Sequence, residues 1–124
     1  MWTYLAVAVG GGVGCCARYG MTQLIQAVYG KQFPVATLVI NVAGCFLMGF
    51  LFFETLERIT ISPALRAALL TGGLGGFTTF STFALESLLL MEDGENTTAM
   101  LYLTLSVFLG LVAALFGAFA ARKL

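Results

Sequence analysis

The stretch GGLGGFTTFSTF, residues 72–83, decides how this chain is built. It lies inside a long apolar run, 63–91, and four of its first five residues are glycine. Glycine in a helix interior costs about 1 kcal/mol per site relative to alanine. We therefore expect the run to form a helix that unwinds locally near residues 72–79.

The composition of the whole chain indicates that this break lies in a membrane. Of the 124 residues, 60% are hydrophobic and 10% are charged, and the mean hydropathy is +0.98. Soluble domains run nearer to ~45–50% apolar and ~25% charged residues, and a small domain buries too little surface to hide this much apolar side chain. In lipid, freed backbone groups persist only where protein buries them or water reaches them, so the break is a candidate site.

The apolar runs predict an all-α membrane protein with four transmembrane helices in a single domain, 1–124. A span needs roughly 20 apolar residues to cross ~30 Å of hydrocarbon. Polar turns separate the runs, and Glu54 to Arg58 reads as a water-exposed connector. Ser62-Pro63 then has the residues of a helix N-terminus. The predicted spans are about 2–29, 34–53, 63–91 with its break, and 97–121.

The charges between the spans give a modest orientation signal. An even number of spans puts both termini on one side, which then holds Arg58, Arg66, Arg122 and Lys123, while the other side holds Lys31. The positive-inside rule therefore favours cytoplasmic termini.

A broken membrane helix is a common place for an ion. Unwound carbonyls can coordinate a cation, and a half-helix N-terminus presents N–H groups to an anion. Here carbonyls from Gly75 to Thr78 suit a cation, and a new helix is expected to start near Thr79. The alternative is a kink that serves helix packing only.

The residues after the break form two helical faces. Phe80 and Phe83 share one face; such a pair usually packs or faces lipid, but its positive ring edges can also meet an anion. Thr79, Thr82 and Glu86 lie on the adjoining face. Glu86 needs a partner or water in a membrane, and Arg18, the only cation deep within a span, is the natural candidate.

Polar residues on other spans are fewer. Asn41 is the only amide in the body of the second span, with Thr37 one turn before it, and serves either as interhelical glue or as a donor into a pathway. Tyr102 and Ser106 continue a hydroxyl stripe that starts at Thr98 on the fourth span, and hydroxyls can donate to an anion.

Several function classes lack support. The chain has no histidine, a net charge of zero and no basic run, so neither catalytic bases nor nucleic-acid binding are indicated. Cys15, Cys16 and Cys45 lie in apolar runs, like small buried hydrophobes. We expect no enzyme. Small residues four apart, such as Gly10 and Gly14, favour close helix packing, and so small a chain favours oligomerisation.

Three ordered motifs resemble the Fluc (CrcB-type) fluoride channels. Residues 11–19, GGVGCCARY, resemble the family's first-helix signature, and residues 36–44, ATLVINVAG, its second-helix signature around a pore asparagine. Residues 72–83, followed by Glu86, look like its broken third helix. The resemblance covers essentially the whole chain.

This resemblance implies an antiparallel, dual-topology homodimer in the lipid bilayer, with two pores. Family members are passive fluoride channels that export fluoride across the cytoplasmic (inner) membrane of prokaryotes, which gives fluoride resistance. By resemblance, the fluoride pathway comprises ring edges of Phe80 and Phe83 and hydrogen-bonding groups at Asn41, Ser81, Thr82, Tyr102 and Ser106, with Thr37 beside them. The matching structural sodium ion is held by backbone carbonyls of Gly75 and Thr78. Arg18 and Glu86 are the structural or vestibule charges.

The chain departs from the family pattern at Gly110, where a further hydroxyl would extend the stripe from Ser106. Two other functions stay open on the residues alone. One is a small multidrug exporter, which needs a membrane acid in the first span where this chain has Arg18. The other is a membrane subunit that transports nothing.

Overall fold

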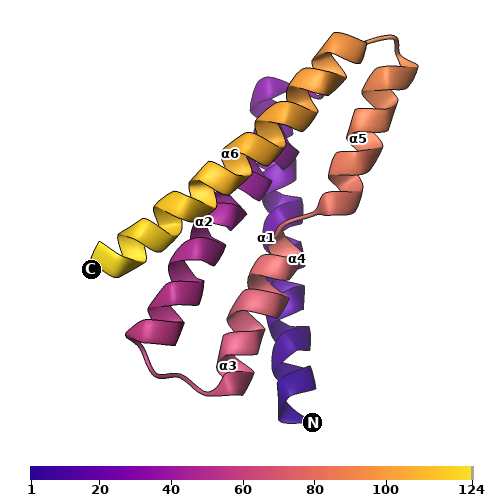
Figure 1. Ribbon diagram of the computed structural model, residues 1–124. Helices are drawn as coiled ribbons and strands as arrows, with labels where there is room; N and C mark the ends of the chain where they lie inside the picture. The colour runs from indigo at the N-terminus through magenta and orange to yellow at the C-terminus, as the bar shows by residue number, and fades with distance from the viewer. Residues whose placement is uncertain (124) are drawn as a thin grey trace.

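The computed structural model describes residues 1–123, and all regular structure within them is helical (Figure 1). The elements in chain order are α1 (Trp2–Tyr29), α2 (Val35–Glu57), α3 (Pro63–Ala67), the π-helix η1 (Ala68–Leu74), α4 (Gly75–Phe77), α5 (Phe80–Glu92) and α6 (Asn96–Lys123).

Within residues 1–123, three stretches are long and apolar enough to cross a membrane: α2, the run Pro63–Glu92, and α6. The structure therefore supports a multi-pass membrane protein. The 28 residues of α1 suffice for a span in length, but α1 is not among the three. Its glycines, glutamines and Arg18 make it the less apolar helix.

The third predicted span is broken within residues 72–79, as expected, but the expectation that the glycines of residues 72–76 unwind is wrong. Ala68–Leu74 winds as a π-helix and Gly75–Phe77 continues as α-helix, so the backbone stays helical through all four glycines. The break falls two residues later than the last glycine. Thr78 (φ −88°, ψ 160°) and Thr79 (φ −150°, ψ 121°) are extended, and a new helix begins at Phe80.

Close packing against α1 explains why the glycines stay helical. A Cβ at Gly10 would overlap the carbonyl oxygen of Ala68, and one at Gly14 would overlap that of Gly73. A Cβ at Gly72 would in turn come within 2.6 Å of the Val7 carbonyl oxygen. Without side chains the two backbones approach each other directly, as small residues permit in membranes. This packing offsets the low helix propensity of glycine.

The second helix is longer than predicted, because Glu54 to Glu57 continue α2 instead of forming a loop. Thr55 Oγ1 donates to the Leu51 carbonyl at 2.7 Å and accepts from Arg66 Nε at 2.9 Å. These hydrogen bonds stabilise the last, polar turn of α2 outside the apolar segment. The helix therefore ends at Glu57, beyond the end of the apolar run.

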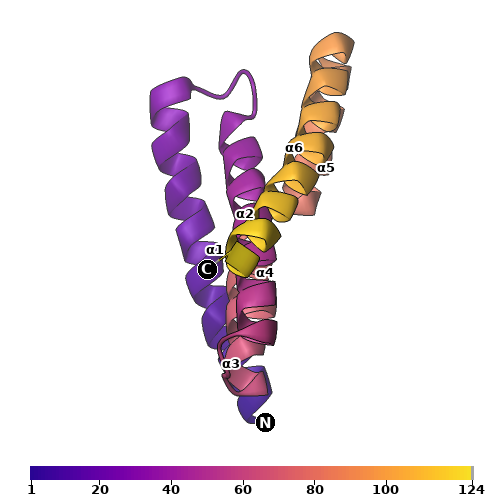
Figure 2. The same ribbon diagram turned by 60° about the vertical axis from the view of Figure 1, so that its left-hand side comes forward.

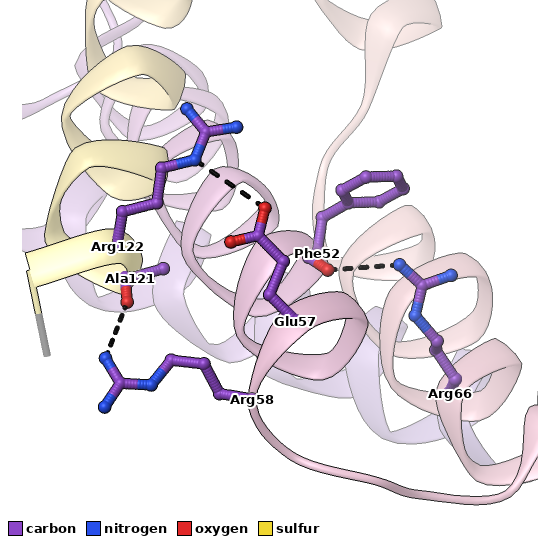
Figure 3. Close-up of polar contacts among 6 residues, drawn as sticks. All are labelled: Phe52, Glu57, Arg58, Arg66, Ala121 and Arg122. Carbon is purple, nitrogen blue, oxygen red and sulfur yellow. Dashed lines mark hydrogen bonds and ion pairs between the residues drawn. The ribbon is translucent and has the colours of Figure 1, made fainter.

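Three arginines lie around this turn: Arg58, Arg66 and Arg122 (Figure 3). We call this part of the molecule the basic end. Arg58 donates to the Ala121 carbonyl at 3.2 Å, and Arg66 to the Phe52 carbonyl at 3.1 Å. Arg122 lies 3.8 Å from Glu57 and its guanidinium stacks over the Phe53 ring. These contacts tie the C-terminal end of α6 to the connector between α2 and α3.

The helices α2 and α6 form the other close pair. A Cβ at Gly49 would overlap the Ala114 carbonyl oxygen, and one at Gly117 would overlap that of Phe46. By contrast α5 packs mainly on α6 and only lightly on α2. Figures 1 and 2 show it beside the N-terminal half of α6, displaced from α1. Its side chains Phe80, Leu85 and Leu88 are exposed.

Candidate functional site

A groove of about 320 Å³ runs beside the break, between α2, α5 and α6. It brings together residues that are far apart in the chain and includes six that the sequence analysis placed at the break or in a pathway: Asn41, Thr78, Thr79, Phe80, Phe83 and Ser106. The lining residues are Asn41, Gly44, Cys45, Met48, Thr78, Thr79, Phe80, Phe83, Ser106 and Val107.

Asn41 holds the extended backbone of the break. Its Nδ2 donates to the Thr79 carbonyl at 3.0 Å, and the Thr79 N–H donates to its Oδ1 at 2.9 Å. The Thr79 N–H can only face an acceptor, which fixes the orientation of the amide. The side chain thus pairs with both backbone polar groups of Thr79, the residue at the break, as lipid requires. One N–H of the amide remains beside the groove.

Thr79 also starts the new helix. It is the N-cap of α5, and its Oγ1 accepts from the Thr82 N–H at 3.2 Å. The same hydroxyl donates to Thr82 Oγ1 at 3.0 Å and lies 3.5 Å from Ser81 Oγ. The hydroxyls of Ser81 and Thr82 therefore cluster at the first turn of α5, where the helix dipole favours negative charge.

The two phenylalanines are neighbours with very different exposure. Their ring centroids lie 5.8 Å apart at an interplanar angle of 59°. Phe83 is 8% exposed and Phe80 is 78% exposed. Both line the groove, so one ring is fixed within the subunit while the other projects from it.

Glu86 is paired within the subunit, but with two hydroxyls and not with Arg18, the candidate partner that the sequence offered. Tyr102 O–H donates to Glu86 Oε1 at 2.8 Å, and Thr37 Oγ1 donates to Oε2 at 3.0 Å. Tyr102 is fully buried, and its ring meets Phe83 edge-on at 5.1 Å between centroids. The carboxylate thus sits next to the phenylalanine pair, held by two hydroxyls.

Arg18 instead contacts the helix just before the break. Its Nε donates to the Gly76 carbonyl at 3.0 Å. Within residues 1–123, no protein N–H or O–H donates to the carbonyl oxygens of Gly75 and Thr78. Those two oxygens are therefore free to accept, and oxygen ligands are what a hard cation requires. The residues present fit the predicted sodium site.

On α6 the predicted hydroxyl stripe divides into two environments. Tyr102 belongs to the Glu86 cluster, whereas Ser106 lines the groove. Ser106 Oγ is buried and has no hydrogen-bond partner among the described residues. Buried hydroxyls are seldom left unpaired, so Ser106 is a candidate for hydrogen bonding to a ligand of the groove.

Sequence reasoning missed three residues of the groove wall on α2: Gly44, Cys45 and Met48. The spacing of Cys45, one helical turn after Asn41, was the available signal, because residues four apart share a helix face.

The sequence of the chain is also similar to those of known proteins. Residues 5–118 match the family described as CrcB-like protein, Camphor Resistance (CrcB). The chain belongs to the CrcB family. It is 58% identical over 121 residues to the fluoride-specific ion channel FluC of Acidithiobacillus ferrooxidans, covering 98% of this chain and 97% of that protein.

Other CrcB relatives span the full chain. The fluoride-specific ion channel FluC of Geobacter sulfurreducens is 48% identical over 124 residues, and that of Flavobacterium psychrophilum is 45% identical over 125 residues, each covering 100% of both chains. These CrcB relatives carry the names of ion channels, not of enzymes.

Proposed function

We propose that this CrcB protein is a fluoride-selective passive ion channel. The main support is the groove beside the break, where uncharged donors and aromatic rings lie together. The relatives of the chain are named fluoride-specific ion channels. Asn41 and Ser106 supply donors in the groove wall, and Phe80 and Phe83 supply the rings, while the hydroxyls of Ser81 and Thr82 lie at the first turn of α5 outside the lining.

The chemistry of the groove suits a small anion that has lost part of its water. Amide and hydroxyl groups donate hydrogen bonds to an anion, and the positive edges of aromatic rings attract it more weakly. Conduction requires binding strong enough to admit the ion and weak enough to release it. A wall of neutral donors meets that requirement, since no fixed cation traps the ion there.

The pathway is completed by a second copy of the chain in an antiparallel, dual-topology homodimer with two pores. The groove is open on one side, α5 packs lightly on the rest of the subunit, and Phe80 projects outward. In this arrangement α1 is the fourth span. Its glycine face packs against η1 and away from lipid, so α1 can cross the membrane with a lower hydropathy than the other helices.

The dimer is further held by a structural sodium ion on the carbonyls of Gly75 and Thr78. Gly75 is exposed on the subunit surface, as a site shared by two copies needs. The ion would supply positive charge to oxygens that otherwise lack a donor.

The cellular setting is the cytoplasmic (inner) membrane of a prokaryote. There the channel lets fluoride leave the cell down its gradient, which confers fluoride resistance.

The test is ion release from liposomes that contain the purified protein. We expect an electrode to record rapid fluoride efflux, with chloride retained under the same conditions. Equal release of both ions would remove selectivity, and no release of either would indicate a subunit that transports nothing. Proton-coupled uptake of a cationic dye would instead indicate a multidrug exporter.

A further inference from the structure

The wall of the groove contains a thiol in line with Asn41. Cys45 lies one helical turn after Asn41 on the same face of α2, and both residues line the groove. Cys45 is half-buried and forms no disulfide. Cys15 and Cys16 are exposed on α1 and do not line it.

On α6, the row of hydroxyls ends at the level of this thiol. Ser106 and Gly110 are four apart on α6 and therefore share a face. Ser106 Oγ is buried without a partner, and one turn later the buried Gly110 has no side chain to continue the polar row. A Cβ at Gly110 would lie 3.3 Å from Cys45 Sγ. The sulfur of Cys45 thus takes up the space in which a side chain at position 110 would lie.

We infer that the Cys45 thiol is a further residue of the anion pathway, which takes the place of a hydroxyl at Gly110 as the hydrogen-bond donor after Ser106. This inference rests on the proposed channel function. A thiol is a weak donor, and it is also the one group of the groove that a thiol-specific reagent can alter. The same placement makes Cys45 the site at which such reagents block the channel.

The first experiment compares variants in liposomes. Cys45→Ala should lower the fluoride efflux rate by about three- to tenfold, the range expected for one lost hydrogen bond. Cys45→Ser should keep the rate at least at the parent level. The double variant Cys45→Ala/Gly110→Ser restores a hydroxyl in the vacated space and should recover the loss. Cys16→Ala is the matched control and should change nothing.

The second experiment uses methyl methanethiosulfonate on the Cys15→Ala/Cys16→Ala protein. The Cys45 thiolate attacks the sulfenyl sulfur, a disulfide to the methylthio group forms, methanesulfinate leaves, and the thiol proton passes to water. We expect efflux to stop and a reducing thiol to restore it, while the protein that also carries Cys45→Ser is insensitive. Modification of Cys45 without loss of efflux would overturn the inference.

A flux-independent measurement separates this inference from the channel proposal. The rate at which the reagent labels Cys45, followed by mass spectrometry, should be lower in sodium fluoride than in sodium chloride of equal concentration. Equal labelling rates in the two salts, with efflux intact, overturn the role of Cys45 alone. Absence of fluoride efflux from the parent protein would count against the channel itself.

Discussion

At the scale of single residues, Phe80 and Phe83 present the sharpest contrast in the site. Phe83 is buried and packs edge-on against Tyr102, whereas Phe80 contacts Phe83 and otherwise projects from the subunit. Two similar rings one helical turn apart are therefore fixed in different ways. Substitutions at the two positions should have different consequences.

Phe80→Ile should lower fluoride efflux about two- to tenfold, the effect of losing one aromatic contact, with little change in subunit stability. Phe83→Ile should lower both efflux and the midpoint of thermal unfolding, because its ring also packs on Tyr102. Efflux from liposomes and circular dichroism in detergent measure the two effects. Phe116→Ile, at an exposed position on α6, is the control. Unchanged efflux in both variants would exclude the rings from the pathway.

Individual polar residues were predicted from sequence to different extents. The place of Asn41 at the break was predictable, because an amide within a span must find partners. The choice of Thr79 as its partner was not, since the sequence does not show which backbone groups within residues 72–79 lose their helical partners. Charge alone could not decide whether Arg18 pairs with Glu86, because it does not fix distance. Two hydroxyls already satisfy Glu86, and a backbone carbonyl satisfies Arg18.

At the scale of helices, the contact between α1 and η1 depends on glycine at particular positions. Gly14 is buried against Gly73, while Gly12, two residues earlier, has open space where a Cβ would lie. The same helix therefore offers a sensitive and an insensitive site for one substitution.

Gly14→Ala should destabilise the protein by about 1–3 kcal/mol, the usual effect of forcing an extra methyl group into a packed interior. Gly12→Ala should be neutral or stabilise by up to about 1 kcal/mol, the gain in helix propensity. Denaturation in detergent, followed by circular dichroism, measures both. Equal destabilisation by the two substitutions would contradict the close approach of α1 to η1.

The helix bounds were predictable and the helix type was not. The predicted run from Trp2 to Tyr29 matches α1, and hydropathy places the three more apolar helical stretches to within a few residues, because their lengths are set by the hydrocarbon thickness. The glycines of residues 72–76 were read as a break from propensity alone. Their contacts with α1 come from a distant part of the chain, and tertiary packing of this kind overrides propensity.

At the scale of the whole molecule, the charges and the proposed assembly point in different directions. The basic end, with Arg58, Arg66 and Arg122, outweighs Lys31 at the other end, which favours one orientation. A dual-topology dimer needs both orientations in the same membrane.

Labelling of Lys31→Cys, in protein with Cys15→Ala, Cys16→Ala and Cys45→Ser, measures the orientation directly. Lys31 is exposed in the turn between α1 and α2. The positive-inside rule predicts a single orientation, whereas dual topology predicts that an impermeant maleimide labels about half of the protein in intact cells. The remainder should react after permeabilisation. Labelling of all or none of the protein would contradict dual topology.

The π-helix between Ala68 and Leu74 has a consequence for how this channel can vary. A π-turn bonds residues five apart and an α-turn bonds residues four apart, so such a stretch can lose one residue and rewind with its hydrogen bonds still formed. Because a π-turn holds one residue more than an α-turn, a single deletion in Ala68–Leu74 would rewind this stretch as α-helix and leave the break and the face of α5 pointing nearly as they do now. A deletion in a purely α-helical stretch would instead turn everything after it by about 100°, so this segment is the part of the third span that tolerates the loss of a residue without re-aiming the pathway.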